Sequence, residues 1–220
     1  MKLETHIHTS EHSACSLVNA AGAVLRCVKL GYDGMVITNH FCNDGWPKKM
    51  SWENRIDQFM RGYDAAREAA PENFAVILGM ELRFFHENEN DYLIYGLDEA
   101  FLYEHPNFDD LGLEKFSIFA KKHDLLVCQA HPFRFGMEVV RPEYVDAIEV
   151  YNGHAGHAAH NSMAKAWCEM HGKIALSGSD YHGGDSGDGV KLGGIVLQEP
   201  VRDGKALVRA MRAGKFELLK

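Results

Sequence analysis

The segment Lys2-Leu3-Glu4-Thr5-His6-Ile7-His8 decides the fold prediction, because a short strand-like run ends in two histidines. Later hydrophobic runs also end in, or carry, side chains that commonly bind metals. In chain order these side chains are His40, Glu81, His131, Asp180 and His182. When successive strands carry ligand residues at their ends, the simplest structure is a barrel whose strand ends converge on bound cations. The sequence therefore predicts a metalloenzyme.

The composition is that of a soluble globular protein. The 220 residues are predicted to form a single domain, 1–220, with 46% hydrophobic and 25% charged residues. No apolar run resembles a signal peptide or approaches the roughly 18 residues of a membrane helix, so no membrane partner is expected. Five scattered cysteines favour reduced thiols and a cytoplasmic location. The net charge of −8 does not favour nucleic acid as a partner.

Short β-branched runs alternate with helical stretches, which predicts an α/β fold. The predicted strands are Lys2–His8, Met35–Asn39, Phe74–Phe84, Tyr92–Gly96, Leu125–Ala130, Ala147–Tyr151 and Lys173–Ser177. The predicted helices are Asn19–Leu30, Trp52–Ala69, Leu111–His123, His157–His171 and Gly204–Ala213. Gly193–Gln198 is expected to be a late edge strand or a closing segment.

One connection breaks the alternation. Only residues 85–91 separate Phe84 from Tyr92, which is shorter than the ~10–12 residues of a parallel crossover. These two strands are therefore predicted to form a hairpin or a sharply bent pair. The expected fold is an irregular barrel of about seven strands.

The His6-Ile7-His8 motif places two imidazoles two residues apart on a strand. Because side chains alternate with period 2, both imidazoles lie on one face and can reach one ion at ~2.0–2.1 Å. Alone this motif is not specific, but the later segments Ala130-His131-Pro132 and Ser179-Asp180-Tyr181-His182 make it so. Imidazole combined with carboxylate suits zinc, manganese or iron.

Six motifs in this order resemble those of the PHP (polymerase and histidinol phosphatase) family. They are His6-Ile7-His8-Thr9, Ile37-Thr38-Asn39-His40, Gly79-Met80-Glu81, Ala130-His131-Pro132-Phe133-Arg134, Ile148-Glu149-Val150-Tyr151-Asn152 and Gly178-Ser179-Asp180-Tyr181-His182. The resemblance spans residues 2 to 182. It implies a distorted (β/α)7 TIM-like barrel, two or three divalent metal ions, and hydrolysis of a phosphoester.

The resemblance also implies which residues hold each ion. The first ion would be held by His6, His8, Glu81 and Asp180. The second would be shared by Glu81 and His131, with Glu81 bridging the two ions. The third would be held by His12, which lies in the polar loop Ser10–Ser16, together with His40 and His182.

Two positions depart from the family pattern. Family members usually offer a histidine just after the Glu81 segment; here the best-placed residue is Asp91, with His86 as the other candidate. A hairpin can carry either one away from Glu81, so the second ion is expected to be weak or completed by water. Glu4 stands where an aspartate is common, and either orients a ligand imidazole or is an exposed strand residue.

Phosphate binding needs cationic donors beyond the metals, and the guanidinium fork matches phosphate geometry. Arg134 is the first candidate and Arg83 the second. Asn152, with Glu149, binds substrate, orients ligands or makes structural hydrogen bonds. His154, His157 and His160 are expected on a helix surface, with contact at the pocket rim as the alternative.

The predicted activity is metal-dependent hydrolysis of a small phosphomonoester, as in a histidinol phosphatase. Arg134 would stabilise the developing charge, and His131, Asp180 or His182 would move the proton to the leaving oxygen. One alternative is a nuclease or nucleotide phosphatase of the same family. Others are a non-catalytic metal-binding module and hydrolysis of another bond by an amidohydrolase-like barrel.

Overall fold

The structure is a computed structural model that describes residues 1–220 except 43–45, 47–48, 85–86 and 185–192. The strands are β1 (Lys2–Ile7), β2 (Gly34–Ile37), β3 (His40–Phe41), β4 (Ala75–Leu82), β5 (Tyr92–Tyr95), β6 (Leu126–Gln129), β7 (Ala147–Asn152), β8 (Ile174–Gly178), β9 (Ile195–Leu197) and β10 (Phe216–Leu218). The α-helices are α1 (Ala20–Lys29), α2 (Trp52–Ala69), α3 (Glu99–Glu104), α4 (Gly112–Lys122), α5 (Asn161–Met170) and α6 (Gly204–Arg212).

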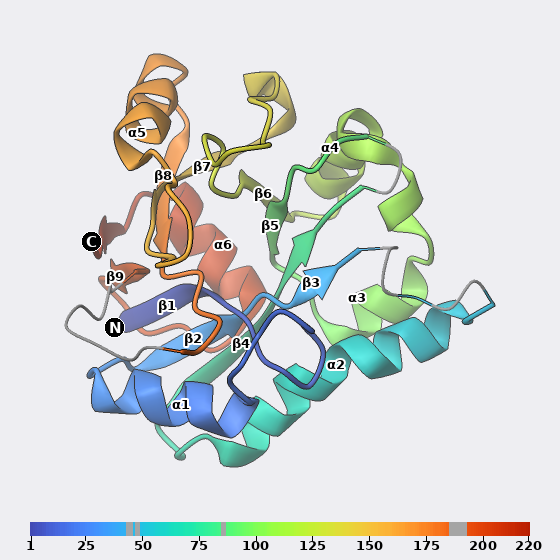
Figure 1. Ribbon diagram of the computed structural model, residues 1–220, viewed down its shortest axis with the longest axis vertical. Coiled ribbons are helices and arrows are strands. Elements are labelled where there is room, and N and C mark those ends of the chain that lie inside the picture. Colours follow the sequence, from blue (N-terminus) through green and yellow to red (C-terminus); the bar gives the residue numbers. More distant parts are fainter. Residues whose placement is uncertain (43–45, 47–48, 85–86, 185–192) are drawn as a thin grey trace.

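The strands form one sheet that curls into a nearly closed, distorted barrel (Figure 1). Its order is β10-β9-β1-β2-β4-β5-β6-β7-β8, and β3 extends it by pairing with β4. Just beyond β8, Tyr181 forms a parallel bridge with Ile7 of β1, and its carbonyl accepts the His8 N–H at 3.0 Å. This contact brings the two ends of the sheet together. The predicted α/β barrel is confirmed.

The predicted break in the alternation is confirmed as a hairpin. Strand β5 runs antiparallel to β4 and to β6, with Leu82 opposite Tyr92. The neighbours β1–β2, β2–β4, β3–β4, β6–β7 and β7–β8 are parallel, so the carboxyl ends of these strands lie at one edge of the barrel. Segment 193–198 contains β9, which pairs antiparallel with β1. Strands β3 and β10 are too short for the sequence pattern to indicate them.

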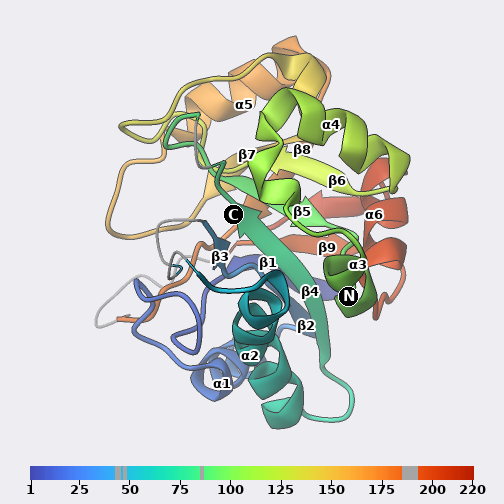
Figure 2. The same ribbon diagram turned by 90° about the vertical axis from the view of Figure 1, so that its right-hand side faces the viewer.

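The helices cover the outside of the barrel, with α1 and α2 packed side by side below β1, β2 and β4 (Figures 1 and 2). Asn19 and Asp203 begin α1 and α6, because their side chains accept backbone N–H groups of the first turn. Short α3 was not predicted; it begins at Asp98, whose side chain accepts the Phe101 N–H. In the described part of the chain, no helix combines the length and apolar character needed to cross a membrane.

The helix predicted over 157–171 was wrong at its start. It begins at Asn161, because His160 has a left-handed backbone (φ 48°) that cannot continue a right-handed helix backwards. His154 and His157 therefore lie in the loop between β7 and α5 and not on a helix surface.

The apolar core and the ligand residues occupy different parts of the same strands. In β1, Leu3 is fully buried in a cluster with Ile77 of β4, and the α6 residues Leu207 and Met211 join this cluster. His6 lies near the carboxyl end of β1, and His8 directly follows the strand. Burial of the apolar part thus holds a rigid frame beneath the polar strand ends.

One close approach links α2 to these strand ends. Gly62 lies in the middle of α2, and a Cβ there would fall 2.3 Å from both Asn39 Nδ2 and Thr9 Oγ1. The Asn39 side chain accepts the Thr9 N–H at 2.7 Å, and its own Nδ2 donates to Thr9 Oγ1 at 3.0 Å. This pair joins the backbone just after His8 to the backbone just before His40. Only glycine at position 62 leaves room for the side chains of Asn39 and Thr9.

We expect Gly62→Ala to lower the free energy of unfolding by about 1–3 kcal/mol, the usual cost of overpacking a full site. Helix propensity alone would instead stabilise this variant by about 1 kcal/mol. Denaturant unfolding followed by circular dichroism shows whether the free energy of unfolding falls or rises. Glu68→Ala, at an exposed position of the same helix, is the control; a Gly62→Ala protein at least as stable as wild type would contradict the close approach.

Candidate metal centre

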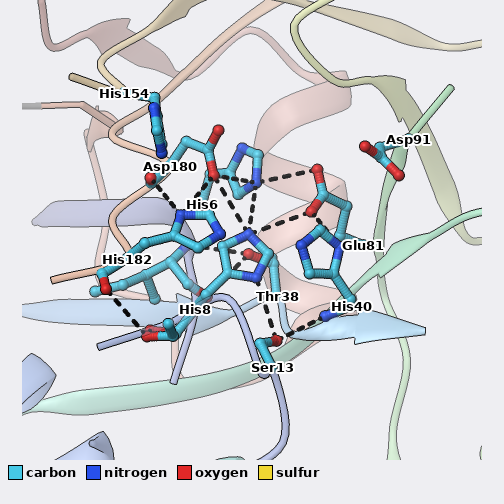
Figure 3. A network of polar contacts seen from close by, with 12 residues as sticks. His6, His8, Ser13, Thr38, His40, Glu81, Asp91, His154, Asp180 and His182 are labelled. Carbon is cyan, nitrogen blue, oxygen red and sulfur yellow. Dashed lines mark hydrogen bonds and ion pairs between the residues drawn. The ribbon is translucent and has the colours of Figure 1, made fainter. Parts of the chain in front are cut away.

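His6 and His8 direct their Nε2 atoms at one point, as the period-2 argument predicts. These nitrogens lie 3.1 Å apart, and both rings are fully buried. Glu81 and Asp180 face the pair: His6 Nε2 lies 3.3 Å from Glu81 Oε1 and 3.3 Å from Asp180 Oδ1, and His8 Nε2 lies 3.2 Å from Glu81 Oε2 (Figure 3). The structure thus brings together the four residues that the resemblance assigns to a first ion.

Glu81 lies at the centre of the network. Beyond His6 and His8, its carboxylate lies 2.9 Å from His40 Nδ1 and 3.2 Å from His131 Nε2. Burial opposes ionisation, but the charges of His40 and His6 hold the pKa of Glu81 well below its ordinary value. Pairing of β3 with β4 sets His40 directly beside Glu81 in register. The carboxylate is therefore placed to bridge two neighbouring ligand groups.

A second group of ligand atoms lies beside the first. Atoms of His8, His40 and His182 are within 4.8 Å of one another. Cys15 contacts this group: burial raises its pKa, but hydrogen bonds with His182 and His40 outweigh burial and lower the pKa to about 6. The sequence placed His12 here. In the structure the His12 Nε2–H donates to the His40 carbonyl at 2.9 Å, and His8 stands with His40 and His182 instead.

Buried hydrogen bonds orient the ligands. Glu149 Oε1 accepts from His6 Nδ1 at 2.8 Å, which turns the His6 Nε2 lone pair towards the centre. Its other oxygen accepts the His131 N–H at 2.9 Å and the Asn152 amide at 2.9 Å. Asn152 also donates to Asp180 Oδ2 at 3.1 Å. Of the roles that the sequence left open for Glu149 and Asn152, these contacts fit the orientation of ligand residues.

Glu4 is buried and bonds to backbone. Its Oε1 accepts the N–H groups of Thr5 at 2.9 Å, His6 at 3.1 Å and Ser179 at 2.9 Å. Burial raises the pKa of Glu4 despite these bonds. Glu4 thus ties the chain around His6 to the residue before Asp180. The prediction of an exposed strand residue was wrong, because Glu4 is fully buried; its contact with the ligand residue His6 is made through the backbone N–H.

Two of the ligand residues have unusual backbone conformations. His131 (φ 26°) and Asp180 (φ 51°) lie in the left-handed region that favours glycine. Such strain persists only where surrounding contacts hold it, and it occurs often at functional sites. Here the contacts are those of Glu149 with the His131 N–H and of Asn152 with the Asp180 carboxylate.

Asp91 reaches the centre but is bonded to Arg83. The Arg83 Nε and Nη2 donate to the two Asp91 oxygens at 2.8 and 2.9 Å. Asp91 Oδ2 lies 3.9 Å from His131 Nε2, and its ligand atoms form a group with His40 and Glu81. Burial and nearby Glu81 raise the pKa of Asp91, against the effect of Arg83. Arg83, the second phosphate candidate, is thus also the partner of Asp91. The rival ligand candidate His86 lies outside the described residues.

A cavity of about 230 Å³ opens over the centre. Its lining includes the predicted Arg83, Arg134, Glu81, His131, Asp180 and His182, together with His154 and His157. Among the described residues, no carboxylate pairs with the Arg134 guanidinium. For His154 and His157 the structure agrees with the alternative prediction of contact at the pocket and not with the helix surface.

Divalent metal ions fit this donor set. Imidazole nitrogens and carboxylate oxygens are the ligands of zinc, manganese and iron, and here they are buried with their lone pairs facing one another. Two imidazole nitrogens 3.1 Å apart between two carboxylates are the arrangement that a shared cation stabilises.

No protein-family model and no curated protein sequence matches the chain. Solved structures do. A two-domain protein of Bacteroides vulgatus that contains a predicted PHP-like metal-dependent phosphoesterase matches with a TM-score of 0.56 and 20% identity. The match covers 83% of this chain and 52% of that one, so the chain spans about half the length of the Bacteroides protein.

Two further structures match over almost their whole lengths. A candidate metal-dependent phosphoesterase of Bifidobacterium adolescentis has a TM-score of 0.50 and 14% identity, over 96% of each chain. An amidohydrolase of Chromobacterium violaceum, solved with bound sulfate and no metal, has a TM-score of 0.51 and 14% identity, over 100% of this chain and 99% of that one. The resemblance to PHP-like proteins is thus confirmed at the level of the fold.

Metal binding is expected to release protons and to tighten as pH rises. Burial opposes protonation, but neighbouring carboxylates raise the pKa of His6 and His40 well above the ordinary value, and that of His131 above it. These shifts favour the protonated rings in the metal-free protein, and a bound ion must displace those protons. Titration calorimetry with Zn²⁺ or Mn²⁺, in buffers of different ionisation enthalpy, measures the release. Equal heats in all buffers would contradict the prediction.

Proposed function

We propose that the chain is a metal-dependent phosphoesterase that hydrolyses a small phosphomonoester. The observation that carries the proposal is the ligand cluster of His6, His8, Glu81 and Asp180 beneath a cavity that also exposes Arg134. Carboxylates bind cations and the guanidinium binds anions, so the two together suit a phosphate ester. The near-complete ligand set argues against a non-catalytic module.

The proposal gives each residue a role. His6, His8, Glu81 and Asp180 would hold one ion, and His40, His131 and His182 would complete the neighbouring positions. Divalent ions held there would supply Lewis-acid polarisation of the phosphoryl oxygens and activation of water. Arg134 would balance the charge that develops on those oxygens. His131, Asp180 and His182 border the cavity and are the candidates for moving a proton to the leaving oxygen.

Two observations support a small substrate with a tetrahedral anion. The central cavity, about 230 Å³, is of a size for a phosphate with a compact leaving group. The Chromobacterium violaceum protein of the same fold holds sulfate, which has the shape of phosphate. An amide substrate would leave the Arg134 charge without a partner.

One observation favours the alternative of a nuclease or nucleotide phosphatase. Cavities of about 350 and 400 Å³ border the central one and share Cys15 with it. One is lined by Tyr181 and the other by Arg61 and Trp46. A phosphodiester has a group on each side of phosphorus, and such a substrate would use both cavities.

The metal-loaded protein is expected to release phosphate from at least one member of a panel of sugar, nucleoside and amino-alcohol monophosphates. Asp180→Asn and His8→Ala are expected to lower kcat/KM at least about 100-fold, since changes one layer outside a metal's ligands already cost 10–100-fold. Phosphate release and metal content are measured together. His160→Asn, exposed in the loop before α5, is the control; undiminished activity in both ligand variants would refute the proposal.

Comparison of a labelled single-stranded oligonucleotide with the best monophosphate decides between the two substrates. Faster turnover of the monophosphate is expected, with Arg61→Ala leaving it unchanged, because Arg61 lines only the flanking cavity. Faster oligonucleotide cleavage that Arg61→Ala impairs would establish the diester alternative.

A further inference from the structure

His154 and His157 lie over the candidate metal centre from the loop between β7 and α5. Their rings stack with centroids 4.2 Å apart and planes 12° apart. The His154 ring lies 5.2 Å from that of His182, and His157 Nε2 lies 3.9 Å from Asp180 Oδ2. In Figure 3 the His154 ring points towards the Asp180 side of the network. Neither residue has a role in the proposed function.

The loop backbone fixes the proton position on His154. The Gly156 N–H donates to His154 Nδ1 at 2.9 Å, and the His154 N–H donates to Asn152 Oδ1 at 3.0 Å. An Nδ1 that accepts a hydrogen bond carries no proton, so the neutral ring has its proton on Nε2. His154 therefore offers an N–H donor from a ring that the turn holds in place.

His157 has an unused polar atom. Its Nε2 is buried and, among the described residues, has no hydrogen-bond partner. A buried nitrogen without a partner is costly unless a ligand or water supplies one. Both rings line the central cavity with Arg134, which follows His131 by three residues. These three nitrogen-bearing side chains, called the donor wall below, line the same cavity as the carboxylates Glu81 and Asp180.

This wall does not have the geometry of a further metal site. Among the described residues, the groups with three ligand atoms within 4.8 Å contain neither His154 nor His157. The His154 Nδ1 lone pair is already bonded to Gly156, and the guanidinium of Arg134 repels cations. N–H donors beside a guanidinium are instead the environment of an oxyanion.

We propose that His154 and His157 form, with Arg134, a wall of donors that binds the phosphoryl oxygens of the substrate beside the metal centre. The inference rests on the proposed phosphoesterase function and adds two substrate-binding residues to it. Metals and donors would then both hold the same tetrahedral anion. A substrate without several oxygen acceptors on its reacting atom would leave both imidazoles without partners.

The test uses His154→Ala and His157→Ala in the full-length, metal-loaded protein. Titration calorimetry with inorganic phosphate is expected to show affinity about tenfold weaker in each variant, the usual effect of losing one hydrogen bond to a charged group. KM for the best monophosphate is expected to rise with the metal content unchanged. His157→Gln, which keeps an N–H donor, is expected to recover part of the affinity, and His160→Asn in the same loop should match wild type.

Two results would overturn the inference. One is wild-type phosphate affinity in both alanine variants; the other is loss of bound metal in parallel with loss of phosphate affinity, because the imidazoles would then be metal ligands. Thermal unfolding identifies a variant that fails to fold, and His157→Gln then decides. If wild type binds phosphate in this residue-dependent way but hydrolyses no ester, the donor wall stands and the proposed function fails.

Discussion

The buried carboxylate of Glu81 is the constraint on which the site depends. It is almost fully buried, and it lies within 3.3 Å of His6, His8, His40 and His131. A buried charge is tolerated only with compensating partners. Removal of one partner leaves the remaining charge buried and uncompensated, with its full desolvation cost. Three strand ends, those of β1, β3 and β6, must therefore deliver four imidazoles to one point. The barrel achieves this because the ends of its parallel strands meet at one edge, with β3 added to bring His40 alongside.

A layer of polar groups behind the ligand residues fixes the positions of their side chains. Glu149 joins His6 to His131, and Asn152 joins Glu149 to Asp180. Glu4 joins β1 to Ser179 through backbone N–H groups. Each contact is buried, so in a low dielectric it is strong when made and costly when broken. The layer explains how His131 and Asp180 persist in left-handed backbone conformations that sequence patterns do not indicate.

The sequence predicted those features of the fold and site that depend on local periodicity and on the length of connections. Period 2 gave the shared direction of His6 and His8, and the short connection 85–91 gave the β4–β5 hairpin. It could not predict contacts set by register across strands. With Leu82 opposite Tyr92, the next positions bring Arg83 to Asp91, so a residue expected to bind phosphate is bonded to a residue expected to bind metal. The position of His157 depended on one left-handed residue, His160, whose conformation the sequence does not encode locally.

Because of the Arg83–Asp91 pair, the two sides of the centre differ in how readily their carboxylates can bind a cation. Both Asp91 oxygens accept hydrogen bonds from the guanidinium, and Asp91 is fully buried. For Asp91 to bind an ion beside Glu81 and His131, it must give up charge-assisted bonds worth about 1.5–3 kcal/mol each. Asp180, in contrast, faces the imidazoles of His6 and His8 and accepts a hydrogen bond from the neutral Asn152 amide, with no guanidinium bonded to it among the described residues. We therefore expect cation affinity to be higher at the His6–His8 side, because the Arg83 guanidinium supplies fixed positive charge on the Asp91 side.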